Sequence, residues 1–203
     1  MTDASFPAPQ TLAEALAQAT RRLEAAGIDG ARRDARRLLA HAARLAPDRL
    51  ALHLPDALSP EVAGRLDAAL TRRAARVPVA QITGLRAFWG RDFEVTADVL
   101  DPRPETETLV AAALEEPARN LLDLGTGSGC LAVSLLAEWP GARGVATDLS
   151  TAALAVAGRN AARHAVADRL ALREGPWFQA LAEDADGRFD LIVANPPYIA
   201  ARD

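Results

Sequence analysis

The chain has 203 residues, of which 50% are hydrophobic and 25% charged, and its formal net charge is −4. This negative balance argues against a protein that binds nucleic acid through a broad basic surface. The single cysteine, Cys130, excludes a disulfide framework and a cysteine-rich metal site. The first residues lack a basic segment followed by an apolar run, and no apolar stretch approaches the ~20 residues of a membrane span. We therefore expect a cytoplasmic protein with no membrane partner.

Residues 1–78 are predicted to form a small helical domain, because apolar residues recur there at helical spacing. Thr11 and Glu14 form a capping-box pattern at the start of the first helix. Ser59 followed by Pro60 is typical of another helix start. The expected helices span about residues 11–26, 31–45 and 59–77.

Residues 79–104 follow a different pattern, with aromatic and β-branched residues punctuated by glycine. This pattern predicts a β-hairpin linker whose turn lies near Gly90-Arg91-Asp92. Pro102 and Pro104 then hold an extended segment, after which Glu105 is predicted to open a helix that reaches about residue 116.

The remainder of the chain alternates short apolar runs with helical segments. The expected strands are Asn120–Leu124, Arg143–Thr147, Leu170–Arg173 and Phe189–Ala194, with helices at about 130–139 and 150–162. Alternation of this kind predicts an α/β fold with a parallel, doubly wound, Rossmann-like sheet.

A glycine-rich loop, Gly125-x-Gly127-x-Gly129, lies between the first expected strand and its helix. Glycines at such a place let the backbone approach a ligand closely. Asp148, at the end of the next strand, is placed to accept hydrogen bonds from both hydroxyls of a ribose. Asp123, before the loop, is placed either to hold a ligand ammonium, directly or through water, or to serve as a turn aspartate.

Two acidic residues around a glycine loop suit S-adenosylmethionine, which carries an amino acid moiety and a ribose but no phosphate. An NAD site is the alternative, although the loop lacks the dinucleotide spacing G-x-G-x-x-G. Trp177 follows the third strand and is expected beside the adenine, or else as a core residue that caps the sheet. The three histidines show no ligand spacing, so we expect no metal.

The fourth expected strand runs into Asn195-Pro196-Pro197-Tyr198. The prolines end the strand, so Asn195 is expected at the carboxyl edge of the sheet, where open α/β sheets bind ligands. The asparagine side chain and the Pro196 carbonyl offer two acceptor oxygens, which match the two donors of a planar NH2 group. Tyr198 supplies an aromatic face for the same plane.

With these motifs in view, the chain resembles the release factor glutamine methyltransferases, the PrmC/HemK family. The resemblance extends along nearly the whole chain. It rests on Thr83-Gly84, Phe88-Trp89-Gly90, Pro102-Arg103-Pro104-Glu105-Thr106-Glu107, Asp123-Leu124-Gly125-Thr126-Gly127-Ser128-Gly129, Asp148, Trp177-Phe178 and Asn195-Pro196-Pro197-Tyr198. Asp101 and Pro176 depart from the residue types that are usual in the family.

The resemblance implies that residues 1–78 recognise class 1 peptide chain release factors and that residues 105–203 form an S-adenosylmethionine-dependent methyltransferase domain. The substrate it implies is the glutamine side-chain amide of the Gly-Gly-Gln motif. It further implies that Asn195, Pro196, Pro197 and Tyr198 hold the glutamine. The cofactor contacts that it implies are Gly125, Thr126, Gly127, Ser128, Gly129, Asp148, Trp177 and Asn195.

The family's sheet continues for further strands beyond Tyr198, so the resemblance also implies a chain that is incomplete at its C-terminus. We therefore expect an open apolar edge on the fourth strand, weak stability and a tendency to associate through that edge; the intact enzyme is expected to be a monomer. Two alternatives stay open. One is a methyltransferase for the exocyclic amino group of adenine or cytosine, and the other is a non-catalytic binding module.

Overall fold

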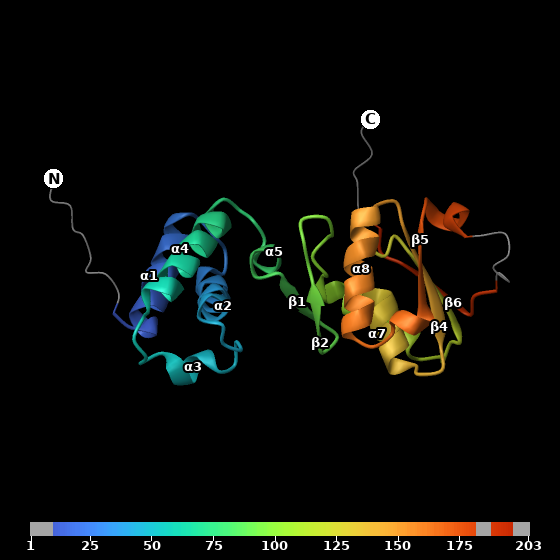
Figure 1. The fold of residues 1–203 in the computed structure, drawn as a ribbon, viewed down its shortest axis with the longest axis horizontal. Coiled ribbons are helices and arrows are strands. Elements are labelled where there is room, and N and C mark those ends of the chain that lie inside the picture. Colours follow the sequence, from blue (N-terminus) through green and yellow to red (C-terminus); the bar gives the residue numbers. More distant parts are fainter. Residues whose placement is uncertain (1–9, 182–187, 197–203) are drawn as a thin grey trace, which may run out of the picture. The chain divides into compact units, whose positions relative to one another are not determined.

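The computed structural model describes residues 10–181 and 188–196. The chain divides into two compact units, Met1–Thr83 and Gly84–Asp203, and each has its own hydrophobic core. Figure 1 shows helices in the first unit and a hairpin and a mixed helix–sheet assembly in the second. Within the described residues, every helix is too short or too polar to cross a lipid bilayer.

The first unit consists of helices, and the two helix starts with capping signals in the sequence are confirmed. The Thr11 side chain accepts a hydrogen bond from the Glu14 N–H at 3.2 Å, and the Glu14 carboxylate accepts from the Thr11 N–H at 3.3 Å, so the capping box is confirmed. Ser59 caps its helix in the same way through the Val62 N–H. The helices are α1 (Leu12–Ala25), α2 (Ala31–Ala43), α3 (Leu50–His53), α4 (Pro60–Ala74) and α5 (Val79–Thr83).

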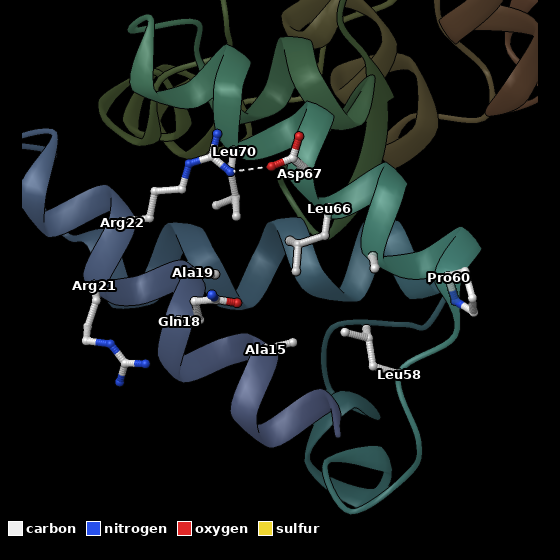
Figure 2. A pocket seen from close by; sticks show the side chains of 11 residues that line it. Ala15, Gln18, Ala19, Arg21, Arg22, Leu58, Pro60, Leu66, Asp67 and Leu70 are labelled. Atoms are coloured by element: carbon white, nitrogen blue, oxygen red, sulfur yellow. Dashed lines mark hydrogen bonds and ion pairs between the residues drawn. The ribbon is translucent and has the colours of Figure 1, made fainter. Parts of the chain in front are cut away.

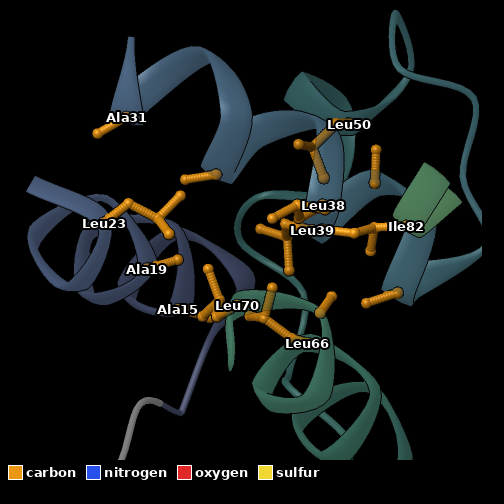
Figure 3. Packing of buried hydrophobic residues seen from close by; sticks show 14 of the residues in the cluster. Ala15, Ala19, Leu23, Ala31, Leu38, Leu39, Leu50, Leu66, Leu70 and Ile82 are labelled. Atoms are coloured by element: carbon orange, nitrogen blue, oxygen red, sulfur yellow. The ribbon is translucent and has the colours of Figure 1, made fainter. Parts of the chain in front are cut away.

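Leucines and alanines from these helices form the core of the first unit (Figure 3). Leu38 and Leu39 of α2 are completely buried, and α1 and α4 pack against them. Asp34 is also buried, and its carboxylate is held by the Arg73 guanidinium at 2.8 Å. The arginine supplies the opposite charge that a buried carboxylate requires.

The hairpin of the second unit comprises β1 (Leu85–Phe88) and β2 (Arg91–Glu94). It is shorter than the sequence indicated, because Val79–Thr83 form helix α5. The turn lies at Trp89–Gly90, earlier than predicted, and Arg91 and Asp92 belong to β2. Phe88 and Phe93 are buried and meet edge to face, with ring centroids 6.0 Å apart.

The second unit contains a parallel sheet in the order β5-β4-β3-β6. The doubly wound α/β fold expected from the sequence is therefore confirmed, with β4 and β3 as the inner strands of this order. Figure 1 shows α7 and α8 on the same side of the sheet. The elements are β3 (Asn120–Leu124), α7 (Cys130–Glu138), β4 (Arg143–Asp148), α8 (Thr151–Arg163), β5 (Leu170–Glu174) and β6 (Leu191–Ala194), with short 3-10 turns at Ala167–Arg169 and Trp177–Ala180.

The predicted helix at Glu105 begins instead as a 3-10 turn, Pro104–Thr106, and continues as α6 (Glu107–Ala113). The fourth strand is also shorter than predicted and starts at Leu191. Asp190, which precedes it, accepts the N–H groups of Arg119 and Asn120 at 2.9 Å each. These hydrogen bonds lower the pKa of Asp190 and join the start of β6 to the start of β3. Within the described residues β6 pairs on one side, with β3.

The side chain of Asn160 connects three elements of the second unit. It is completely buried on α8. Its Oδ1 accepts the Glu94 N–H at 2.7 Å, and its Nδ2 donates to the carbonyls of Glu94 at 3.1 Å and Ser128 at 2.8 Å. One amide thus holds the end of the hairpin and the glycine loop against the same helix.

Replacing Asn160 by alanine leaves these buried backbone groups without partners, each at a cost of about 1–3 kcal/mol. We expect the free energy of unfolding of the second unit to fall by about 2–4 kcal/mol, measured by urea denaturation followed by circular dichroism. Arg159→Ala is the matched control, since it removes only an exposed ion pair with Glu94, worth under about 1 kcal/mol. Equal losses in the two variants would contradict the role given to Asn160.

Candidate functional site

A cavity of about 410 Å³ lies at the carboxyl ends of the sheet strands. It is lined by Gly125 and Gly127 after β3, Asp148 at the end of β4, Trp177 after β5 and Asn195 after β6. The order β5-β4-β3-β6 places the reversal of strand order between β3 and β6, and ligands of doubly wound sheets bind outside such a point. Six residues singled out in the sequence, these five and Pro196, are therefore brought together in the second unit.

The glycine loop leaves room for a ligand. Gly125 and Gly127 have φ angles of 70° and 55°, which favour glycine, and a Cβ at either position would meet no atom within 4 Å. The N–H groups of Gly125 and Thr126 both donate to the Thr147 carbonyl at 2.9 Å, which joins the loop to β4. Any side chain at Gly125 or Gly127 would extend into open space beside the cavity.

The other loop residues face the interior of the unit. A Cβ at Gly129 would lie 3.1 Å from the Cβ of Ala157, so this glycine permits α7 and α8 to approach each other. Thr126 donates its hydroxyl to Asp123 at 2.6 Å, and the Ser128 carbonyl accepts from Asn160. Thr126 and Ser128 line a small cavity of about 50 Å³ that adjoins the first and shares Gly125, Gly127 and Asn195 with it, whereas Gly129 is among the lining residues of neither cavity.

Asp123 is buried, with 1% of its surface exposed. Its carboxylate accepts the Thr126 hydroxyl at 2.6 Å and the Ala132 N–H at 3.3 Å, so it fastens the loop to the first turn of α7. Burial raises its pKa to about 6, and the two hydrogen bonds oppose this rise. The geometry shows that the carboxylate orders the turn, and contact with a ligand ammonium stays a prediction; Asp123 lines a small cavity beside the glycine loop.

Asp148 lies at the cavity wall with part of its surface exposed. Its Oδ2 accepts the Gly127 N–H at 2.9 Å and its Oδ1 accepts the Ser150 N–H at 2.9 Å. Ser150 itself caps α8 through the Ala153 N–H, so Asp148 is not needed as the helix cap. The two backbone donors fix the carboxylate plane and leave each oxygen a further lone pair for a ligand.

Trp177 is 54% exposed, which excludes a role as a core residue that caps the sheet. It begins the 3-10 turn Trp177–Ala180 with a φ of 48°, a backbone angle uncommon for a residue other than glycine. Pro176 precedes it and lines the same cavity. The indole is thus available at the cavity rim.

Asn195 and Pro196 line the cavity directly after β6. The Asn195 Nδ2 donates to the Thr106 hydroxyl at 2.9 Å, so Oδ1 is the acceptor that the amide offers to a ligand. Pro197 and Tyr198, which were predicted to complete the substrate site, lie outside the described residues.

Sequence reasoning missed the segment Asp98–Leu100, which follows the hairpin and lines the cavity. Its residues show no motif, and only the fold brings them beside Asp148. Asp101, next in the chain, pairs with Arg86 of the hairpin at 3.5 Å. This ion pair joins the end of the segment to β1.

A second, larger cavity of about 610 Å³ lies between α1 and α4 of the first unit (Figure 2). Its lining is mainly apolar, with Leu66 and Leu70 among its residues, and Arg22 pairs with Asp67 at 2.6 Å across it. We place the chemistry in the cavity of about 410 Å³, where the glycine loop, a carboxylate and an amide converge.

The raised pKa of Asp123 predicts a pH-dependent stability. Because the folded value of about 6 exceeds the ordinary value of 3.8, the folded state retains the proton, and stability falls as the pH rises from about 4 to 6. The difference between the folded pKa of about 6 and the ordinary value of 3.8 corresponds to a loss of about 3 kcal/mol in the free energy of unfolding. We expect Asp123→Asn, which cannot ionise, to melt at a higher temperature than the wild type above pH 6 and at a similar temperature near pH 4.

Thermal melts followed by circular dichroism between pH 4 and 8 test this expectation. Asp168→Asn is the control, because Asp168 is exposed in a 3-10 turn away from the cavity. A difference between Asp123→Asn and the wild type that stays constant across the pH range would contradict the assigned pKa.

Comparison with known proteins is consistent with this architecture. Residues 14–84 match the family model of the PrmC N-terminal domain, and residues 97–203 match that of the methyltransferase small domain. A release factor glutamine methyltransferase from Cereibacter sphaeroides is 65% identical over 189 residues, which cover 93% of this chain and 66% of that protein.

Proteins of the same name from Rhodospirillum rubrum and Moorella thermoacetica are 46% and 44% identical to the chain. The alignments cover 90% and 93% of this chain and 56% and 67% of those proteins. The chain thus spans about two thirds of the length of these relatives, or less. Both halves of the sequence match and the identity is high, so the chain belongs to the release factor glutamine methyltransferase family.

Proposed function

We propose that this protein transfers a methyl group from S-adenosylmethionine to the side-chain amide nitrogen of the glutamine in the Gly-Gly-Gln motif of class 1 peptide chain release factors. The observation that carries the proposal is the cavity at the carboxyl edge of the sheet, where Asn195 lies with Asp148 and the glycine loop. Family membership supports the choice of substrate. Because release factors act in translation, the proposed place of action is the cytoplasm.

The cavity suits this cofactor better than a dinucleotide. Among the described residues that line it, Asp98 and Asp148 are acidic and none is basic. A cationic ligand without phosphate matches such a lining, whereas a pyrophosphate calls for compensating positive charge. Asp148 would hold the ribose hydroxyls, Gly125 and Gly127 would allow close approach, and Trp177 would cover the adenine.

In this proposal the protein positions a weak nucleophile, the amide nitrogen of the glutamine. The lone pair of an amide nitrogen is delocalised into its carbonyl, so orientation has to supply much of the rate enhancement. The Asn195 Oδ1 and the Pro196 carbonyl would accept the two N–H bonds of the glutamine and so fix the direction of its nitrogen. S-adenosylmethionine supplies an electrophilic methyl on sulfur, and transfer forms a C–N bond, leaves the thioether and releases one amide proton. The proton leaves after transfer, so the proposal requires no catalytic histidine.

Transfer of labelled methyl from S-adenosylmethionine tests the proposal. The purified protein is offered a class 1 release factor, the same factor with the motif glutamine replaced by alanine, and DNA. We expect label in the unaltered release factor alone. Asn195→Ala should lower turnover by at least about 100-fold, because the amide nitrogen is no longer aimed.

Asn120→Ala is the matched control, because Asn120 is exposed at the opposite end of the sheet from the cavity. Near-normal turnover by Asn195→Ala would remove the proposed mechanism. Label in DNA would replace the substrate with a base amino group, and cofactor binding without transfer to either would indicate a binding module.

Cofactor affinity provides a separate prediction, measured by calorimetry with S-adenosylhomocysteine. Asp148→Asn keeps the shape of the side chain but loses the charge-assisted hydrogen bonds to a ribose, so we expect about 10–100-fold weaker binding. Trp177→Ala loses one aromatic face and is expected to weaken binding about 3–10-fold. Asp168→Asn should leave affinity unchanged. Unaltered affinity in both cavity variants would place the cofactor elsewhere.

A further inference from the structure

We infer that Thr106 is a positioning residue for Asn195, and that its hydroxyl holds the asparagine amide with Oδ1 toward the substrate. The inference rests on the proposed function and deepens it. The two residues are 89 positions apart in sequence, and the Asn195 Nδ2 donates to the Thr106 Oγ1 at 2.9 Å. Thr106 is 5% exposed, so little water competes for this hydrogen bond.

The orientation of the Asn195 amide decides what it offers to a substrate. The oxygen and the NH2 group of an asparagine are similar in size, and the torsion that exchanges them is broad and roughly two-fold. With Oδ1 toward the cavity, the side chain accepts from a glutamine NH2 group; in the flipped state it would present donors to donors. In the structure the Thr106 oxygen accepts from Nδ2, which leaves Oδ1 for the substrate. Because a hydroxyl can also donate, the contact restrains the plane of the amide, and the NH2 group of a bound glutamine would favour the state with Oδ1 toward it.

Thr106 is itself held rigidly. It ends the 3-10 turn Pro104–Thr106, where its N–H donates to the Arg103 carbonyl at 3.0 Å. The next residue, Glu107, accepts the Trp89 N–H at 2.8 Å and so fastens the segment to the hairpin turn. A β-branched side chain on such an element has little rotamer freedom. The hydroxyl is therefore presented to Asn195 from a fixed support.

Both residues also line the small cavity of about 50 Å³ that borders the glycine loop. Val at position 106 would have nearly the same volume as threonine but no oxygen, so Nδ2 would lose its partner. Serine would keep the oxygen and lose only a methyl group. The pair of variants separates hydrogen bonding from packing.

The experiment compares Thr106→Val, Thr106→Ser and a control, Thr108→Val, in methyl transfer to the release factor. The Thr108 hydroxyl donates to the Glu105 carbonyl in the same segment and is exposed, so its loss does not reach Asn195. We expect Thr106→Val to lower kcat about 10–100-fold, with the Kd for S-adenosylhomocysteine changed less than about 3-fold. Thr106→Ser should recover most of kcat, and Thr108→Val should match the wild type.

A wild-type kcat in Thr106→Val would overturn the inference, as would an equal loss in the valine and serine variants, because packing alone would then explain the effect. A second readout does not depend on methyl transfer. The Asn195 side-chain NH2 signals, assigned by their absence in Asn195→Ala, are followed by NMR.

We expect Thr106→Val to shift these signals and to speed their exchange with water, while Thr108→Val leaves them unchanged. Unchanged signals in Thr106→Val overturn the positioning role even if the wild type methylates the release factor. Shifted signals together with an inactive wild type support the positioning role and remove the proposed function.

Discussion

The buried amide of Asn160 is the interaction on which the geometry of the cavity depends. It holds both backbone groups of Glu94, at the end of the hairpin, and the Ser128 carbonyl in the glycine loop. Glu94 leads within a few residues to Asp98–Leu100, and the glycine loop carries Gly125 and Gly127; both segments line the cavity. Two parts of the wall of one site are therefore held in place by a single side chain on α8. A small error in the position of that helix would move both walls together and preserve their spacing.

The segment Pro102–Glu107 makes a second connection, between the hairpin and the strand end. Glu107 accepts from the turn of the hairpin, and Thr106 accepts from Asn195. The prolines fix the backbone that carries both acceptors. Thr106 and Glu107, adjacent in the chain, thus contact two elements that are distant in sequence, the end of β6 and the hairpin turn. The short 3-10 turn before α6 orients their side chains toward these two elements.

Much of the fold and the site could be predicted from local sequence. The capping box, the strand ends and the loop glycines have short-range signatures, and these placed Asp148, Gly125 and Asn195 at one edge of the sheet. The roles of Asn160 and Thr106 could not be found in this way, because hydrogen bonds across 66 and 89 positions leave no local pattern. Val79–Thr83 was misassigned because its β-branched residues favour strand, whereas packing of Ile82 against the helical core favours helix.

Every described residue that lines the proposed cofactor cavity belongs to the second unit, and the apolar cavity between α1 and α4 belongs wholly to the first. The linings of the two cavities can therefore change separately during evolution. Recombination could exchange the helical unit while the second unit keeps its cavity, and substitutions on the surface of one unit would leave the cavity of the other intact.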